Sequence, residues 1–173
     1  MIIKGSNFII RDIRNDELED VLEVYRNCED FLSLGPVPKA SMQMVLADIN
    51  LSKEEGGTFC GIFQENKMIG IIDFVPSNFN GVGKNAFISL LMISKCHRRK
   101  GLGKDVVGLV ENVILENADI EAILSGVQVN NVEAIRFWNS LGYKIVSEAK
   151  LLPDGTTVYD LRKDTTLKTK KCL

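Results

Sequence analysis

The sequence has few of the residues that build metal sites and disulfide frameworks. Its 173 residues include one histidine and four cysteines, and the cysteines form no CxxC pair. No spacing of metal ligands is therefore present, and we expect no metal centre. Isolated cysteines favour reduced thiols in a cytosolic protein. They are Cys28, Cys60, Cys96 and Cys172.

Long apolar runs and an excess of positive charge are also missing. No apolar run reaches the ~20 residues that a membrane-spanning helix needs. The first residues lack the apolar segment and the cleavage site of a signal peptide. The formal net charge of −2 leaves no basic footprint of the kind that nucleic-acid-binding proteins usually carry. We therefore expect a cytoplasmic protein that binds neither membranes nor nucleic acids.

The residues that are present suit one globular domain. Apolar residues make up 45% of the chain and charged residues 25%, both ordinary values. A chain of 173 residues can bury a sizeable core in a single domain. No linker, repeat or low-complexity segment divides it. We place the domain at residues 1–162 and a polar, basic tail, which we expect to fray, at residues 163–173.

Apolar periodicity and turn signals predict the mixed α/β order β-α-α-β-β-β-α-β-α-β-β. The strand at Ala86–Ser94 is apolar on both faces and should be central. With the helix and the strand that follow, it forms a candidate βαβ unit with a right-handed crossover. The predicted strands are Phe8–Ile13, Thr58–Gln64, Met68–Val75, Ala86–Ser94, Glu121–Val129, Tyr143–Ala149 and Thr156–Leu161.

Capping residues and 3.6-residue spacing predict four helices. The first begins with Asn15 as its N-cap. The second starts near Ser41, and the third follows the central strand and ends near Ala118. The fourth is opened by Asn130, with Glu133 three residues later in a capping-box pattern.

A basic loop with two glycines joins the central strand to its helix. Gly101 and Gly103 let the backbone approach a ligand closely. They lie where the helix begins, so free N–H groups and the positive end of the helix dipole point at that ligand. A diphosphate suits such a site, and the alternative is a tight turn with solvated basic side chains. Four positive charges favour the anion site: Arg98, Arg99, Lys100 and Lys104.

The loop is neither of the two common nucleotide-binding motifs. A Walker A pattern is absent, and Val106 replaces the third glycine of GxGxxG. Residues 98–103 instead match R/Q-x-x-G-x-G/A. A later helix carries a second pattern, an opening Asn followed by A-x-x-F/L-Y and L-G-F/Y. Its counterparts are Asn131, Ala134, Phe137-Trp138 and Leu141-Gly142-Tyr143.

With these two motifs the sequence resembles the GNAT family of acetyl-CoA-dependent N-acetyltransferases. The resemblance covers nearly the whole chain, because the order of elements also agrees. It implies a mixed, mostly antiparallel sheet of about seven strands, split between the fourth and fifth, with helices on both faces. It also implies acetyl-CoA as cosubstrate, an amine acceptor as partner, and a monomer or homodimer.

The resemblance assigns roles to particular residues. The backbone of residues 99–104 would hold the coenzyme A pyrophosphate, and Arg98 would shape the loop. The central strand would offer its backbone to the pantetheine arm and the acetyl carbonyl, with an oxyanion donor near Met92 or Ile93. Asn131 would either bind the pantetheine or only cap its helix. The implied coenzyme-binding residues are Leu91, Met92, Ile93, Arg98, Arg99, Lys100, Gly101, Leu102, Gly103, Lys104, Asn131, Phe137 and Trp138.

The family's usual proton-transfer residues are missing. Trp138 stands where a Tyr is common, and an indole N–H is no proton-donating acid at neutral pH. Phe87 stands where a strand Glu is common. Asp73, inside an apolar strand, is the remaining candidate base, and solvent exposure by strand alternation is its alternative. His97 lies beside the loop, where a surface histidine is the simpler interpretation.

We therefore predict an N-acetyltransferase. It would move the acetyl group of acetyl-CoA to a primary amine of a small molecule or a protein by direct attack. The alternative is a non-catalytic domain that binds or senses acyl-CoA, which the missing Tyr and Glu would suit.

Overall fold

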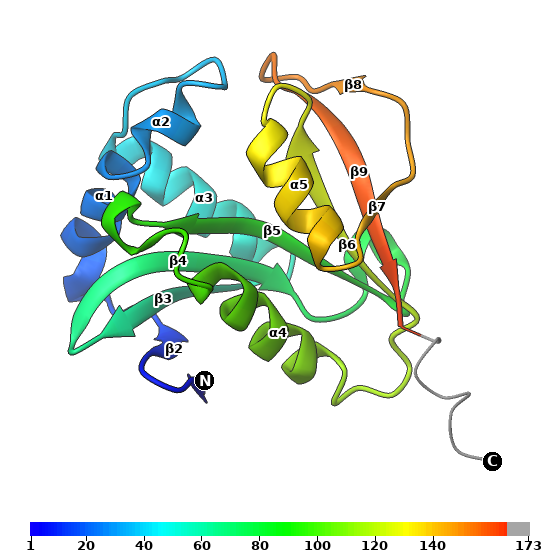
Figure 1. The fold of residues 1–173 in the computed structure, drawn as a ribbon, viewed down its shortest axis with the longest axis horizontal. Coiled ribbons are helices and arrows are strands. Elements are labelled where there is room, and N and C mark those ends of the chain that lie inside the picture. Colours follow the sequence, from blue (N-terminus) through cyan, green and yellow to red (C-terminus); the bar gives the residue numbers. More distant parts are fainter. Residues whose placement is uncertain (166–173) are drawn as a thin grey trace.

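The computed structural model describes residues 1–165 (Figure 1). Within them, nine strands form one sheet in the order β1-β2-β3-β4-β5-β6-β9-β7, and β8 pairs with β9. The strands are β1 Ile2–Lys4, β2 Ile9–Asp12, β3 Thr58–Gln64, β4 Lys67–Val75, β5 Asn85–Ile93, β6 Ala122–Gln128, β7 Lys144–Ile145, β8 Lys150–Leu151 and β9 Thr157–Asp164. The helices are η1 Asn15–Glu17, α1 Leu18–Arg26, α2 Glu29–Leu32, α3 Met42–Glu54, η2 Phe79–Gly81, η3 Lys95–His97, α4 Leu102–Ile114 and α5 Val132–Ser140.

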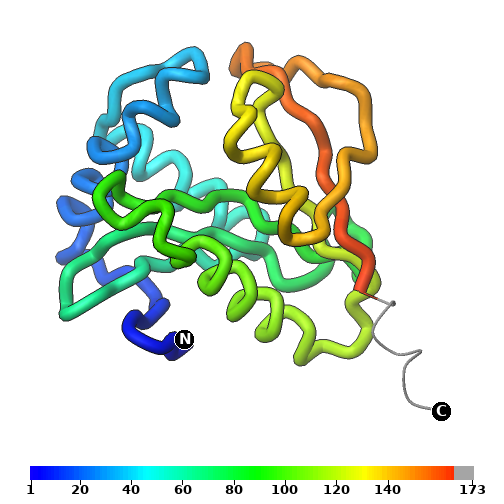
Figure 2. Tube along the Cα trace, in the orientation of Figure 1, coloured from blue at the N-terminus to red at the C-terminus, as the bar shows by residue number. Residues whose placement is uncertain are grey.

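The sheet is antiparallel except between β5 and β6, which run parallel. These two strands pair only over Asn85–Ile88 and Ala122–Ser125, so β5 continues to Ile93 without β6 beside it. Figure 2 shows how β5 and β6 diverge beyond these residues. The predicted mixed sheet, mostly antiparallel and split between these strands, is confirmed.

A β-bulge marks the start of the split. Asp73 of β4 pairs with Leu90, whereas the next residue, Phe74, pairs with Ile88. Ser89 is therefore an extra residue on β5, directly after the last residue that pairs with β6. Bulges bend a strand and re-aim its side chains. The bulge thus bends β5 away from β6 and places Ser89 where the split between these strands begins.

Two apolar clusters cover the two faces of the sheet. Helices α4 and α5 contribute to one cluster, and α1 and α3 contribute to the other. Neighbouring residues of β4 alternate between them: Ile72 belongs to the first and Ile71 to the second. In Figure 1, α4 and α5 lie on the near side of the sheet and α3 on the far side. Helices therefore flank both faces, as predicted.

The C-terminal strands differ from the prediction. The strand expected at Tyr143–Ala149 is reduced to β7, and a short strand, β8, follows it. Ile145 and Val146 are about half exposed, so this edge buries little apolar surface that could hold a long strand. Strand β9 continues to Asp164, so two residues of the predicted tail belong to the sheet. Residues 166–173, the rest of that tail, lie outside the described residues.

Both predicted Asn caps are wrong in detail. At the first helix, Asn15 begins a 3-10 turn, and the Glu17 carboxylate accepts the backbone N–H of Arg14 at 2.9 Å. At α5, the N-cap is Asn131, whose Oδ1 accepts the Ala134 N–H at 3.0 Å. Contacts outside the helix decide both cases: Glu17 is held by Arg11 of β2, six residues before it, and Asn130 donates to the Leu34 carbonyl, far away in the sequence.

Smaller differences concern the ends of the chain and of α4. Strand β1 was not predicted, and α4 ends at Ile114 rather than near Ala118. No helix among residues 1–165 is long and apolar enough to cross a membrane.

Candidate active site

The basic loop forms a cradle at the beginning of α4. Gly101 is the N-cap of this helix and has φ +84°, and Arg99 has φ +60°. Both lie in the left-handed region, which leaves backbone N–H groups pointing into the loop. A Cβ on Gly103 would lie 3.3 Å from the Phe137 ring and 3.4 Å from Ile93. The glycine therefore keeps the helix start close to β5 and α5 and leaves the cradle open.

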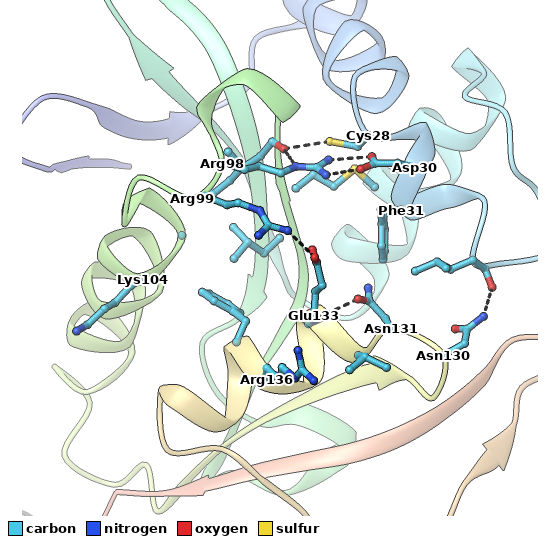
Figure 3. A pocket seen from close by; sticks show the side chains of 18 of the residues that line it. Cys28, Asp30, Phe31, Arg98, Arg99, Lys104, Asn130, Asn131, Glu133 and Arg136 are labelled. Atoms are coloured by element: carbon cyan, nitrogen blue, oxygen red, sulfur yellow. Dashed lines mark hydrogen bonds and ion pairs between the residues drawn. The ribbon is translucent and has the colours of Figure 1, made fainter.

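Arg98 holds the loop to the rest of the site. Its Nε donates to the Ile93 carbonyl at 2.6 Å, and its guanidinium makes two hydrogen bonds to Asp30 of α2, at 2.6 and 3.1 Å. This ion pair lowers the pKa of Asp30. Figure 3 shows the pair beside Cys28, whose thiol pKa is raised by burial. Arg98 is thus a structural link between the cradle and α2, in agreement with a loop-shaping role.

The other basic side chains of the loop are more exposed. Arg99 pairs with Glu133 of α5 at 2.5 Å, and both side chains are about four-fifths exposed. Figure 3 shows this contact spanning the cavity between the loop and α5. Lys100 turns back and donates to the Cys96 carbonyl at 3.1 Å, while Lys104 is exposed.

A cavity of about 860 Å³ lies between the cradle, β5 and α5. Most of the predicted coenzyme-binding residues line it: Leu91, Met92, Ile93, Arg98, Arg99, Gly101, Gly103, Lys104, Asn131 and Phe137. Three do not line this cavity. They are Lys100, Leu102 and Trp138. Sequence reasoning missed several other lining residues, among them Cys28, Asp30 and Phe31 of the α1–α2 region, which no local motif marks.

Trp138 packs in the core. It is 6% exposed, and its ring meets those of Phe137 and Tyr143 edge to face at 5.3 and 4.9 Å. Its role in packing agrees with the favoured interpretation of that residue. Asn131 caps its helix and also lines the cavity, so both interpretations of that residue are compatible with its position.

A second cavity, of about 670 Å³, adjoins the first at the split. It is lined by aromatic side chains that include Phe79 and Phe87, whose rings stack at 4.1 Å, and by β5, β6 and β9. The two cavities share five lining residues, so they meet where β5 leaves β6. The shared residues are Phe31, Leu91, Asn131, Ala134 and Phe137.

Asp73 is buried rather than solvent-exposed. It is 5% exposed and accepts two hydrogen bonds, from Ser52 Oγ at 2.6 Å and from Ser89 Oγ at 2.5 Å. It lines neither cavity, whereas Ser89 lines the second. The sequence does contain a signal for Ser89, because it is the one polar residue between Phe87 and Ile93 of an otherwise apolar strand.

His97 lies outside both cavities and is half-buried beside Cys96, with Nδ1 3.0 Å from the Cys96 sulfur. It therefore stands away from the place where the cavities meet. Among residues 1–165 no group of three or more His, Cys, Asp or Glu side chains is placed to hold a metal ion. The described site offers hydroxyls, backbone groups, one buried carboxylate and a basic cradle.

Comparison with known proteins gives a family and a set of similar folds. Residues 16–143 match the model of the acetyltransferase (GNAT) family. No curated protein sequence matches the chain.

Solved structures of similar fold include three acetyltransferases. An acetyltransferase of Thermus thermophilus has a TM-score of 0.75 at 16% identity, over 95% of this chain and 99% of that one. One of Salmonella typhimurium, which modifies the N-terminal serine of a 50S ribosomal subunit protein, has a TM-score of 0.74 at 15% identity, over 95% and 99%. AAC(6')-Ib in complex with ribostamycin and coenzyme A has a TM-score of 0.74 at 16% identity, over 96% and 99%. At these identities the likeness establishes the fold.

Proposed function

The chain belongs to the acetyltransferase (GNAT) family, and we propose that it transfers the acetyl group of acetyl-CoA to a primary amine by direct attack. The observation that carries this proposal is the meeting of two cavities at the split between β5 and β6. One cavity begins at the anion cradle and suits the donor. The other adjoins it at the split and suits an acceptor. A thioester at their junction would be within reach of a nucleophile that enters from the second cavity.

The donor would lie along the cradle and β5. Backbone N–H groups of residues 99–104 would bind the pyrophosphate at the N-terminus of α4. Arg99 and Lys104 would add positive charge, and Arg99 would exchange Glu133 for a phosphate. The pantetheine arm would run past Phe137 toward Asn131. This arrangement uses the residues that line the larger cavity.

The free edge of β5 would stabilise the oxyanion that forms on the acetyl carbonyl. Ser94 donates its N–H to Ile69 of β4. Backbone groups of an antiparallel strand alternate in direction, so the N–H groups of Leu91 and Ile93 point away from β4, into the split. The sequence suggested an oxyanion donor near Met92 or Ile93, and this alternation favours the N–H of Ile93. A preorganised N–H in this position would stabilise the developing negative charge.

The acceptor would be an amine of a small molecule or a protein. Both kinds occur among proteins of this fold, since the Salmonella enzyme modifies an N-terminal serine and AAC(6')-Ib was solved with ribostamycin. The second cavity has charged groups of both signs at its rim, and Lys150 pairs there with Asp160. Its interior is largely aromatic and aliphatic.

A pair of glycine variants tests the donor site. Gly103→Asp would place a Cβ against Phe137 and a negative charge in the cradle, so acetyl-CoA should no longer raise the melting temperature. Gly108→Asp is the matched control, because a Cβ there meets nothing within 4 Å and the residue lies farther along the same helix. We expect the control to retain the thermal shift. An equal shift in both variants would mean that the diphosphate binds elsewhere.

Release of free coenzyme A thiol with a panel of amines then tests transfer. The panel should combine N-terminal peptides with small amines and aminoglycosides. Thiol release that depends on an amine supports the proposed transfer. Tight acetyl-CoA binding without amine-dependent release would instead favour the non-catalytic alternative.

A further inference from the structure

Ser89 connects the acceptor cavity to a buried carboxylate. It is the extra residue of the β5 bulge, immediately after the last residue that pairs with β6. Its hydroxyl donates to Asp73 Oδ2 at 2.5 Å, and the residue lines the second cavity beside Leu90 and Leu91. The bulge therefore places a hydroxyl between the second cavity and the carboxylate behind it.

Asp73 has no cation to neutralise it in the described chain. None of the salt bridges within residues 1–165 includes it. Its partners are the hydroxyls of Ser52 and Ser89. A buried carboxylate without a cation is costly to keep charged, and such groups cluster at functional sites. Because Asp73 lines neither cavity, it cannot itself contact an acceptor there.

We propose that Ser89 is a catalytic residue that relays the acceptor's proton to Asp73. This inference rests on the proposed acetyl transfer. The amine nitrogen attacks the acetyl carbon and forms the C–N bond. The nitrogen gives its proton to Ser89 Oγ while Ser89 gives its own proton to Asp73 Oδ2, so no free alkoxide forms. The C–S bond then breaks, and the coenzyme A thiolate leaves and takes a proton from water. Asp73 returns its proton through Ser89 to water.

Ser52 provides a matched control. Its hydroxyl donates to the other oxygen of the same carboxylate at 2.6 Å, but the residue is 2% exposed, lies on α3 and lines neither cavity. Both serines stabilise Asp73, and only Ser89 can also meet an acceptor. A purely structural role for the carboxylate would make the two serines equivalent.

The experiment measures transfer from acetyl-CoA to methylamine at high concentration. Methylamine is small enough to enter a cavity whatever the shape of the natural acceptor. We expect Ser89→Ala to lower the rate about 100-fold, which is the lower end of the usual range for loss of a general base. We expect the Ser52→Ala enzyme to be at least tenfold faster than the Ser89→Ala enzyme. Ser89→Thr keeps a hydroxyl and should retain most of the wild-type rate. All variants should keep the wild-type KM and thermal shift for acetyl-CoA.

A double variant separates a relay from two independent effects. Because the two groups act as one unit, Ser89→Ala combined with Asp73→Asn should be no slower than the slower single variant. Equal losses in Ser89→Ala and Ser52→Ala, or additive losses in the double variant, would overturn the relay.

A wild-type rate with methylamine no higher than the uncatalysed rate would also overturn the relay, because these groups act only on the nitrogen. If acetyl-CoA still raises the melting temperature in that case, the proposed donor site stands although the relay has failed.

Discussion

Two buried carboxylates, Glu111 and Asp73, have opposite surroundings. Glu111 lies on α4 and accepts from Lys163 Nζ at 2.8 and 2.6 Å and from the Tyr143 hydroxyl at 2.9 Å. Asp73 lies toward the opposite face, and its side-chain partners among residues 1–165 are two serine hydroxyls and no cation. The residues are similarly buried, at 8% and 5% exposure.

The difference distinguishes a carboxylate that is paired with a cation from one for which we propose a role in proton transfer. A cation neutralises Glu111, and the resulting network joins α4 to β9 and to the residue before β7. Burial raises the pKa of the Tyr143 hydroxyl, which therefore stays a neutral donor to Glu111. Around Asp73 the nearby acids add to the negative charge: the pKa of Asp48 is raised by burial and also by Asp73. We therefore expect mutations at Glu111 to affect stability and mutations at Asp73 to affect transfer.

The largest expected effect is the loss of stability when Glu111 loses its cation. Lys163→Met leaves a buried carboxylate without a counter-charge. Because the Lys163 side chain is 28% exposed, we expect the free energy of unfolding to fall by about 2–3 kcal/mol, less than for a fully buried ion pair. Urea denaturation measures the change. Lys163→Arg keeps the charge and should retain most of the stability. If Lys163→Met left the unfolding midpoint unchanged, the ion pair with Glu111 would not stabilise the fold. The structural role that we assign to Glu111 would then be wrong.

A matched exchange of carboxylate for carboxamide should give an effect of similar size on transfer. Asp73→Asn removes a proton acceptor while keeping its shape, so we expect an about 100-fold slower transfer to methylamine. We expect its unfolding midpoint to change little. Glu111→Gln should do the reverse, with lower stability and, per folded molecule, a rate within about twofold of wild type because Glu111 lines neither cavity. Equal rates in the two variants would contradict a chemical role for Asp73.

A third buried carboxylate, Glu17, is paired with a cation as Glu111 is, and we expect its loss to have a smaller effect on stability. Hydrogen bonds from Arg11 lower the pKa of Glu17 from 4.5 to about 2. A carboxyl whose folded pKa is lowered stabilises the fold above its unfolded pKa, and this stabilisation is lost as pH falls through about 4.5 toward 2. Glu17→Gln should therefore cost about 1–2 kcal/mol at pH 7 and progressively less at acidic pH.

Unfolding free energies at pH 7 and pH 3 measure this dependence. A difference between Glu17→Gln and wild type that stayed constant over this interval would show that the ion pair with Arg11 does not contribute through charge.

The fold and the residues that line the candidate donor cavity could largely be predicted because their signals are local. The strand Thr58–Gln64 has the predicted bounds, since its β-rich run is delimited by turn residues on both sides. The glycines of the cradle, Gly101 and Gly103, can be recognised from their spacing in the motif of residues 98–103. The motif of residues 98–103 also predicted the candidate anion site, because the N-terminus of a helix is formed by residues close together in the sequence.

The acceptor half could not be predicted because its parts come from distant segments. Phe31 lines both cavities, yet it is sixty residues from Leu91, which does the same. Ser89 is a polar residue in an apolar strand, and only the register of β4 and β5 places it in a bulge. The wrong cap at Asn130 has the same origin, since Asn130 donates to Leu34 in a distant part of the chain.

The sequence by itself determined the order of elements, the cradle at Gly101 and Gly103, and the family resemblance. Each of these depends on residues within one turn, one strand or one motif. Only the tertiary structure decided that Asp73 is buried with no cation from the described part of the chain and that Glu111 has one. The reason is physical: the partners of a buried charge are set by strand register and helix packing, which bring together residues that no local pattern relates.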